Sequence, residues 1–236
     1  MKLAIAFAYA CLALGGCWWT DADDYQPIPQ QTRIPPTGPA PIGAVSGRVC
    51  LLVDPRFSTM CETTIDLSSI TITLGDVTTR ASADGAFSFH ASPVGTNLAF
   101  TLAGPTIMRT TVGFSPNTVL PVLSQSLYNQ MLNSIGFTPQ SPNGGVLAFV
   151  SQGGTPLANV SAVATPTGVT GPFYDGNSGL TWNGISTGVA GAMWLPGQAP
   201  GPTVLGLHDL TDNTEQNVEG IQVIDGGITM VNTAFP

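Results

Sequence analysis

Ser69-Ile-Thr-Ile-Thr-Leu74 decides the fold class of this chain, because its residues alternate strictly between aliphatic and hydroxyl side chains. Ile70, Ile72 and Leu74 fall on one face and the threonines on the other, which is the pattern of a strand with one buried face. Gly75-Asp76 ends the segment, and similar short apolar segments separated by Gly and Pro recur along the chain. The pattern therefore predicts an all-β protein of short strands and many turns.

The residues on either side of this strand predict a first β-sandwich over residues 43–117. Asp84-Gly85 is a turn signal between two short strands, 77–81 and 85–89, and predicts that they form a hairpin. These two strands and the other short apolar segments of this region predict a sandwich of six or seven strands. The other expected strands of this sandwich span residues 44–53, 69–74, 98–103 and 107–114.

One helix is predicted within residues 118–144, which form a linker after the first sandwich. Apolar residues that include Leu127 and Met131 recur there every fourth position. Ser124 can cap the start of the helix, and Gly136 can end it in a left-handed conformation. We expect this stripe to pack on a neighbouring sheet, although a Met-bearing stripe can also serve as a groove for a partner.

Residues 145–236 predict a second β-sandwich, because short apolar segments resume after the helix. Thr-, Val- and Ala-rich runs alternate there with Gly- and Pro-containing turns. The expected strands of this half span residues 145–150, 155–163, 188–194, 203–207, 222–225 and 228–232.

Three motifs in these segments resemble the carboxypeptidase regulatory-like, or transthyretin-like, domain. They are Gly43-Ala-Val-Ser-Gly-Arg-Val49, the Thr-rich strand, and Ala83-Asp-Gly-Ala-Phe87. Thr155–Val163 is similar to the second strand of the same family, with Asn159 where the family usually has Gly. The resemblance implies two tandem prealbumin-like (Ig-like) β-sandwiches with one short connecting helix. The segment that carries Cys50 and Cys61 departs from the family pattern as an insertion.

The first sixteen residues have the properties of an export signal. Lys2 precedes an apolar run of twelve residues, which is shorter than the ~20 residues that cross a bilayer. Leu14-Gly-Gly-Cys17 resembles the lipobox of bacterial lipoproteins. The resemblance implies that Cys17 receives a diacylglycerol and becomes the acylated N-terminus, which anchors the protein to the lipid bilayer of the cell envelope. Trp18, rather than Asp, after the cysteine favours the outer membrane; an ordinary cleaved signal is the alternative.

Residues 17–42 are predicted to be a tether between the lipid and the first sandwich. Six prolines lie between residues 20 and 42, and such sequences favour extended polyproline II, roughly 60–70 Å long here. Asp21, Asp23 and Asp24 form an acidic cluster. We interpret this cluster as part of a solvated tether, with a metal site as the alternative.

The charge of the mature chain limits the classes of partner. After the signal is removed, five Arg and fourteen acidic residues leave a formal side-chain charge of −9, and no Lys remains. A chain of this charge is unsuited to nucleic acid or to anionic lipid headgroups. The absence of Lys excludes Schiff-base catalysis and Lys–Asn isopeptide bonds.

Cys50 and Cys61 are the two cysteines of the mature chain besides Cys17. In an exported protein, an isolated pair at this spacing predicts a disulfide that closes a small loop. A metal site or a catalytic dithiol, the alternatives, would require closer spacing or further ligands.

The sequence offers no convincing catalytic group, metal site or cofactor site. Gly184-Ile-Ser-Thr-Gly188 fits the G-x-S-x-G pattern around Ser186, but no helix pattern follows it as a nucleophile elbow requires. His90 and His208 fall in different predicted sandwiches, without identifiable partners. We therefore expect that the protein is not an enzyme, and keep a hydrolase using Ser186 as the least favoured alternative.

The segment between Gly171 and Trp182 is the most suggestive candidate for ligand binding. Aromatic side chains beside amide and carboxylate groups can stack on a sugar or a peptide while hydrogen-bonding it. The alternative is that these aromatic residues only cover the end of a small core. The candidate ligand-binding residues are Phe173, Tyr174, Asp175, Asn177 and Trp182.

These observations predict a membrane-anchored accessory lipoprotein of the cell envelope. It would bind a protein or a glycan through loops of its β-sandwiches. The alternative is a structural subunit of an envelope complex or surface filament, which self-assembles through exposed strand edges.

Overall fold

Strand β2 (Thr71–Leu74) shows the alternation that its sequence predicts. Ile72 and Leu74 are fully buried, whereas Thr71 and Thr73 are half-buried. A two-residue loop, Gly75-Asp76, joins β2 to β3 (Val77–Arg80) in an antiparallel hairpin. Gly75 has a φ of +60°, which tight hairpin loops require and which glycine adopts without strain.

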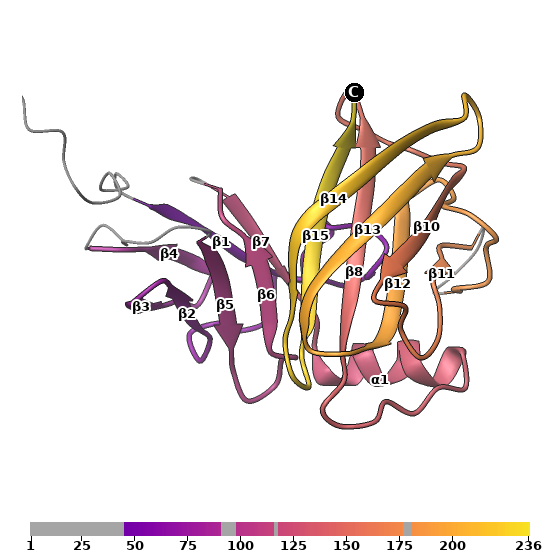
Figure 1. Cartoon of the computed structure of the whole chain (residues 1–236). Helices are drawn as coiled ribbons and strands as arrows, with labels where there is room; N and C mark the ends of the chain where they lie inside the picture. Colours follow the sequence, from indigo (N-terminus) through magenta and orange to yellow (C-terminus); the bar gives the residue numbers. More distant parts are fainter. Residues whose placement is uncertain (1–44, 91–97, 116–117, 177–180) are drawn as a thin grey trace, which may run out of the picture. The chain divides into compact units, whose positions relative to one another are not determined.

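The computed structural model describes residues 45–90, 98–115, 118–176 and 181–236 (Figure 1). Cys17, the predicted tether and Asn177 lie outside these residues. The described residues contain fifteen strands and one helix, and all-β sandwich architecture is confirmed. The remaining strands are β1 (Ser46–Leu51), β4 (Ala86–Ser88), β5 (Ala99–Ala103), β6 (Thr110–Gly113), β7 (Thr118–Val122), β8 (Gly144–Gln152), β9 (Thr155–Pro156), β10 (Val160–Thr165), β11 (Phe173–Tyr174), β12 (Ala192–Gln198), β13 (Gly201–Asp209), β14 (Thr214–Val223) and β15 (Ile228–Phe235).

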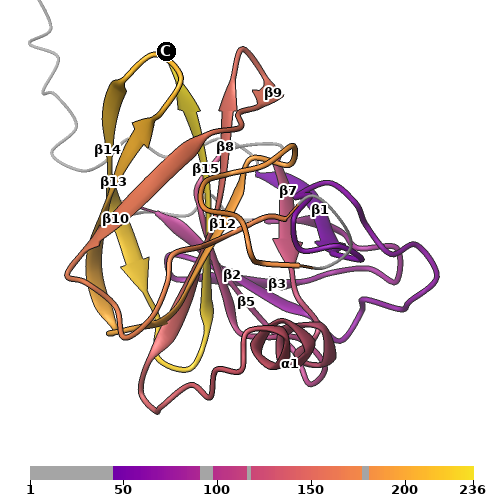
Figure 2. The ribbon, with the colours of Figure 1, turned by 90° about the vertical axis from the view of Figure 1, so that its right-hand side faces the viewer.

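The strands form three sheets that face one another across two apolar cores. The large sheet has the order β11-β12-β8-β15-β6-β5-β2-β3, and β9 pairs with β8. The sheet β4-β1-β7 packs on the β2–β5–β6 part of it, with Phe87, Phe100 and Leu120 in the core. The sheet β10-β13-β14 packs on β8 and β12, with Met193 and Leu205 in the second core (Figure 2).

The large sheet contains strands from both predicted sandwiches, because β15 pairs in parallel with β6 on one side and with β8 on the other. One apolar core likewise contains residues from both halves, among them Phe100 and Trp194. The domain boundaries stay a prediction, and the structure adds that the two halves share a sheet.

The hairpin predicted around Asp84-Gly85 is not formed. A turn is present, since the Gly85 N–H donates to the Ser82 carbonyl at 2.9 Å. However, β3 pairs with β2, and β4 pairs with β1 in the other sheet. The turn therefore carries the chain from one layer to the other, which places Phe87 between the layers, where it is buried.

The predicted helix is confirmed as α1 (Gln125–Ser134). The hydroxyl of Ser124 accepts a hydrogen bond from the Leu127 N–H at 3.0 Å, as an N-cap should. Gly136 follows the helix with a φ of +65°. The buried side of α1 includes Tyr128, whose ring packs edge-on against Trp194 of β12. The stripe therefore packs on a sheet.

Tyr128 is expected to make the protein less stable at alkaline pH. Burial raises the pKa of Tyr128 to about 12, whereas a tyrosine in an unfolded chain titrates near ~10. As the pH rises, the tyrosine loses its proton in the unfolded chain before it does so in the folded protein. The contribution of Tyr128 to the free energy of unfolding is therefore complete below pH ~10. It is lost as the pH rises through about 12, at up to ~1.4 kcal/mol per pH unit. Urea unfolding of the wild type and of Tyr128→Phe, repeated across this pH range, measures the loss. Identical slopes of the free energy of unfolding against pH in the two proteins would contradict the prediction.

Candidate functional site

The predicted disulfide is confirmed, and it closes a loop between β1 and β2. Cys50 and Cys61 are bonded with their Cα atoms 5.0 Å apart. A short ladder lies beside the bond, in which the Val53 N–H donates to Met60 and the Glu62 N–H donates to Leu51. We call residues 51–60 the disulfide loop.

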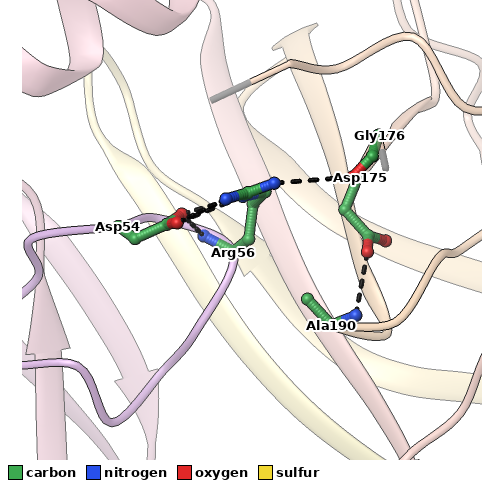
Figure 3. Close-up of polar contacts among 5 residues, drawn as sticks. All are labelled: Asp54, Arg56, Asp175, Gly176 and Ala190. Atoms are coloured by element: carbon green, nitrogen blue, oxygen red, sulfur yellow. Dashed lines mark hydrogen bonds and ion pairs between the residues drawn. The ribbon is translucent and has the colours of Figure 1, made fainter. Parts of the chain in front are cut away.

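Arg56 fixes the conformation of the disulfide loop through an ion pair with Asp54 (Figure 3). Nη2 donates to Asp54 Oδ2 at 2.6 Å, and both Nε and the backbone N–H of Arg56 donate to Oδ1 at 3.0 Å. The two side chains are only 12% and 15% exposed. The hydrogen bond with Asp54 raises the pKa of Arg56 above its ordinary value, although burial acts against it. The guanidinium is therefore charged and held in one geometry.

The same guanidinium connects the disulfide loop to the chain after β11. Nη1 of Arg56 donates to the Gly176 carbonyl at 3.4 Å. The neighbouring Asp175 carboxylate is 2% exposed and accepts three backbone hydrogen bonds, from Gly188 (2.7 Å), Ala190 (2.9 Å) and Ala192 (3.0 Å). Asp175 therefore shapes the 188–192 turn, and Arg56 ties that region to the disulfide loop.

A surface pocket of about 320 Å³ lies beside this connection. Its lining comes from the disulfide loop, β8, the β8–β9 turn, β9, Ala190 and β15. Phe57 and Phe149 supply aromatic surface, and hydroxyl and amide groups supply hydrogen-bonding atoms. We call it the disulfide-loop pocket, and its lining residues are Arg56, Phe57, Ser58, Thr59, Phe149, Val150, Ser151, Gly154, Pro156, Ala190 and Asn232.

The candidate ligand-binding residues between 171 and 182 make internal contacts where the structure describes them. Phe173 and Trp182 pack on the ring of Trp194, at centroid distances of 6.1 and 5.6 Å. Tyr174 Oη accepts a hydrogen bond from the Ala162 N–H at 2.8 Å, and burial raises the pKa of this tyrosine. Ligand binding by this segment stays a prediction.

Ser186 lies in a loop without the surroundings of a nucleophile elbow. It lines a separate hollow of about 520 Å³ together with Asp175, and no histidine is among the lining residues. His208 Nε2 instead lies 2.9 Å from Asn213 Oδ1. In the part of the chain that the structure describes, no group of three His, Cys, Asp or Glu side chains could hold a metal ion.

Sequence reasoning missed the residues that line the disulfide-loop pocket. Arg56 and Phe57 lie inside a loop that was identified only by its cysteines. Phe149 and Asn232 come from strands far apart in sequence, so only the β8–β15 pairing brings them together. The adjacent Asp54-Pro-Arg-Phe57, flanked by the two cysteines, was the one local signal available.

Loss of the disulfide is expected to destabilise the protein by ~3 kcal/mol, because a closed loop of this length restricts the unfolded chain. Urea unfolding with and without a thiol reductant measures the difference. The double variant Cys50→Ala/Cys61→Ala should match the reduced wild type and respond to the reductant no further. A reductant effect that persists in the double variant would contradict this assignment.

The described residues contain no helix long and apolar enough to cross a membrane. No family model matches the sequence, and no curated protein matches it. Among solved structures, the minor pilin GBS52 of Streptococcus agalactiae has a TM-score of 0.23 and 10% identity, over 81% of this chain and 94% of that chain. A shaft pilin of Lactobacillus rhamnosus GG has a TM-score of 0.24 and 9% identity, over 82% and 97%. A fimbrial protein of Bacteroides ovatus has a TM-score of 0.22 and 8% identity, over 81% of this chain and 50% of that chain. At such low TM-scores, these similarities carry no information about function.

Proposed function

We propose that this protein is a lipid-anchored accessory protein of the cell envelope that binds a glycan or a protein segment in the disulfide-loop pocket. The observation that carries the proposal is the pocket itself, whose wall is held by a disulfide and by the Arg56–Asp54 ion pair. A wall fixed before the ligand arrives lowers the entropy cost of binding.

The lining favours a neutral ligand with both apolar and polar groups. The guanidinium of Arg56 is engaged by Asp54 and by the Gly176 carbonyl, so its charge is already paired. Phenyl rings and neutral hydroxyl and amide groups make up much of the remaining lining. Small pockets of this kind bind by shape and a few hydrogen bonds.

Anchoring through Cys17 is part of the proposal, and it rests on the lipobox-like Leu14-Gly-Gly-Cys17. The intact mass of the mature protein from a bacterial host tests it. A chain that begins at an acylated Cys17, two hydrogens lighter for the Cys50–Cys61 disulfide, is expected. An unmodified chain that begins at another residue would mean that the protein is secreted and not lipid-anchored.

Ligand binding is tested by titrating the ¹⁵N-labelled mature chain, carrying Cys17→Ser, with neutral trisaccharides and blocked tripeptides. The amide resonances of Ser58, Thr59 and Asn232 should shift in a saturable way with one of the two classes. Phe57→Ala should abolish the shifts. Ile185→Ala is the matched control, because Ile185 is 92% exposed and lies outside the lining. If no probe shifts these resonances, the pocket is not a binding site for either class.

A further inference from the structure

Strand β15 loses one of its two neighbours halfway along its length. It pairs with β8 from Ile228 to Phe235, but with β6 only from Ile228 to Met230. β15 lies between β8 and β6 in the large sheet (Figure 1). The pairing that ends at Met230 therefore leaves an opening within the sheet, which we call the notch. Beyond Met230, no strand among the described residues pairs with that side of β15.

The backbone groups of two residues point into this notch. The Ile228 N–H donates to the Arg109 carbonyl on the β6 side at 2.8 Å. Because alternate residues of a strand direct their N–H and C=O groups to the same side, Asn232 and Ala234 direct theirs to the β6 side as well. They therefore offer two donors and two acceptors to a further strand.

A groove of about 350 Å³ lies over the last paired residues of β6 and β15 and reaches the notch at Asn232, whereas Ala234 lies beyond its lining. One wall is β6 with the residues that follow it, the second is β14 from Val218 to Gln222, and the floor is β15 from Thr229 to Asn232. The Thr229 hydroxyl donates to the Gln222 carbonyl at 2.7 Å and fixes β14 over the floor. β14 therefore closes a third side of the groove. We call it the β6–β15 groove.

Two further observations describe what the groove would accept. The Thr111 hydroxyl is buried at its wall without a hydrogen-bond partner among the described residues. Glu219, which lies at a bulge of β14, is the one charged residue in the lining, and it is exposed. An occupant therefore needs backbone hydrogen-bonding groups, and it gains from a positive charge.

We propose that the β6–β15 groove takes up an extended segment of a partner protein, which pairs with β15 at Asn232 in the groove and continues to Ala234 beyond it, and which places a basic residue opposite Glu219. The segment completes the interrupted sheet by strand addition, with main-chain hydrogen bonds for affinity and the charge for selectivity. The β6–β15 groove and the disulfide-loop pocket are two different sites, although Asn232 contributes to the lining of both.

The probes are three blocked pentapeptides, acetyl-Thr-Val-X-Val-Thr-amide, in which X is Arg, Glu or Pro. They are titrated into the ¹⁵N-labelled mature chain carrying Cys17→Ser, and amide hydrogen exchange is followed by NMR. We expect the Arg peptide to protect the Asn232 and Ala234 amides, and to bind roughly fivefold more tightly than the Glu peptide, because Glu219 is exposed. The Pro peptide should not bind, because it lacks a central N–H donor.

The matched variant is Glu219→Lys, at an exposed position outside both cores. It should reverse the preference between the Arg and Glu peptides. The shifts of Ser58 and Thr59 on adding the trisaccharide or tripeptide probes should be the same as in the wild type. Equal binding of all three peptides, or no protection at Asn232 and Ala234, would overturn the proposal. Slow hydrogen exchange of the Asn232 and Ala234 amides in the free, monomeric protein would also overturn the proposal, because the chain's own residues would then fill the groove. If that slow exchange in the free protein disappeared on dilution, the occupant would be a second copy of this chain and not a partner protein.

Discussion

Replacing Asp175 with alanine is expected to lower the free energy of unfolding by about 4 kcal/mol. The carboxylate is 2% exposed and accepts hydrogen bonds from the backbone of Gly188, Ala190 and Ala192. Without it, three N–H groups lose their acceptor, two of them in nearly fully buried bonds, and each buried unpaired donor costs ~1–3 kcal/mol. Urea unfolding followed by tryptophan fluorescence measures the loss.

Two matched variants separate this buried role from a general effect of losing an aspartate. Asp175→Asn keeps the size but replaces one acceptor oxygen with an NH₂ group, so an intermediate loss is expected. Asp212→Ala should have little effect, because Asp212 is exposed and accepts only local hydrogen bonds from Thr214. If Asp175→Ala were no less stable than Asp212→Ala, the three backbone bonds would have no energetic importance.

Truncating Trp194 to alanine is expected to cost about 3–5 kcal/mol, as large aromatic residues in cores do. Trp194 is fully buried in β12, and its ring contacts Tyr128 of α1, Phe173 of β11 and Trp182. The variant therefore removes the ring contact between Tyr128 of the helix and the sheet, together with two further aromatic pairs. Thermal unfolding should show a lower midpoint, with loss of the near-ultraviolet circular dichroism signal of the cluster.

Trp194→Phe is the control for this effect. The indole Nε1 of Trp194 is buried without a hydrogen-bond partner among the described residues. Phenylalanine removes that unpaired donor and keeps much of the apolar contact, so we expect a clearly smaller loss than for alanine. An equal loss in both variants would mean that the indole makes an interaction that the structure does not contain.

Local patterns predicted the elements whose signals lie within a few residues. The alternation of Ile72 and Leu74 with threonines predicted β2, and Ser124 with the Leu127 stripe predicted α1. Such positions constrain the local backbone, so they can be recognised without knowing the rest of the fold.

Pairings between distant strands were not predictable in the same way. β7 was not recognised, because Pro121 interrupts its pattern and its partner is β1, about seventy residues earlier. The Asp84-Gly85 turn was recognised, but a turn alone does not show whether its two strands stay in one sheet. Here Phe87 packs between the layers, and that burial places β4 in the sheet opposite β3.

The candidate site was predicted only in part. The disulfide of Cys50 and Cys61 followed from their spacing and from the export signal. Asp175 was identified as a candidate ligand-binding residue, but the structure places its carboxylate on the backbone of the 188–192 turn. In the sequence, a loop aspartate that binds a ligand looks the same as one that accepts hydrogen bonds from the backbone. Only the positions of the surrounding N–H groups in the fold distinguish the two roles.

The position of β1 has a mechanical consequence. Any tension that reaches the fold from the residues before Val45 enters at β1, which has a neighbour on each side: β4 from Ser46 to Arg48 and β7 from Gly47 to Leu51. When the force is directed along the strand, the bonds to both neighbours bear it together instead of opening one after another. At the end of β1, the covalent bond from Cys50 to Cys61 transmits the load past the disulfide loop, so residues 51–60 are shielded from extension.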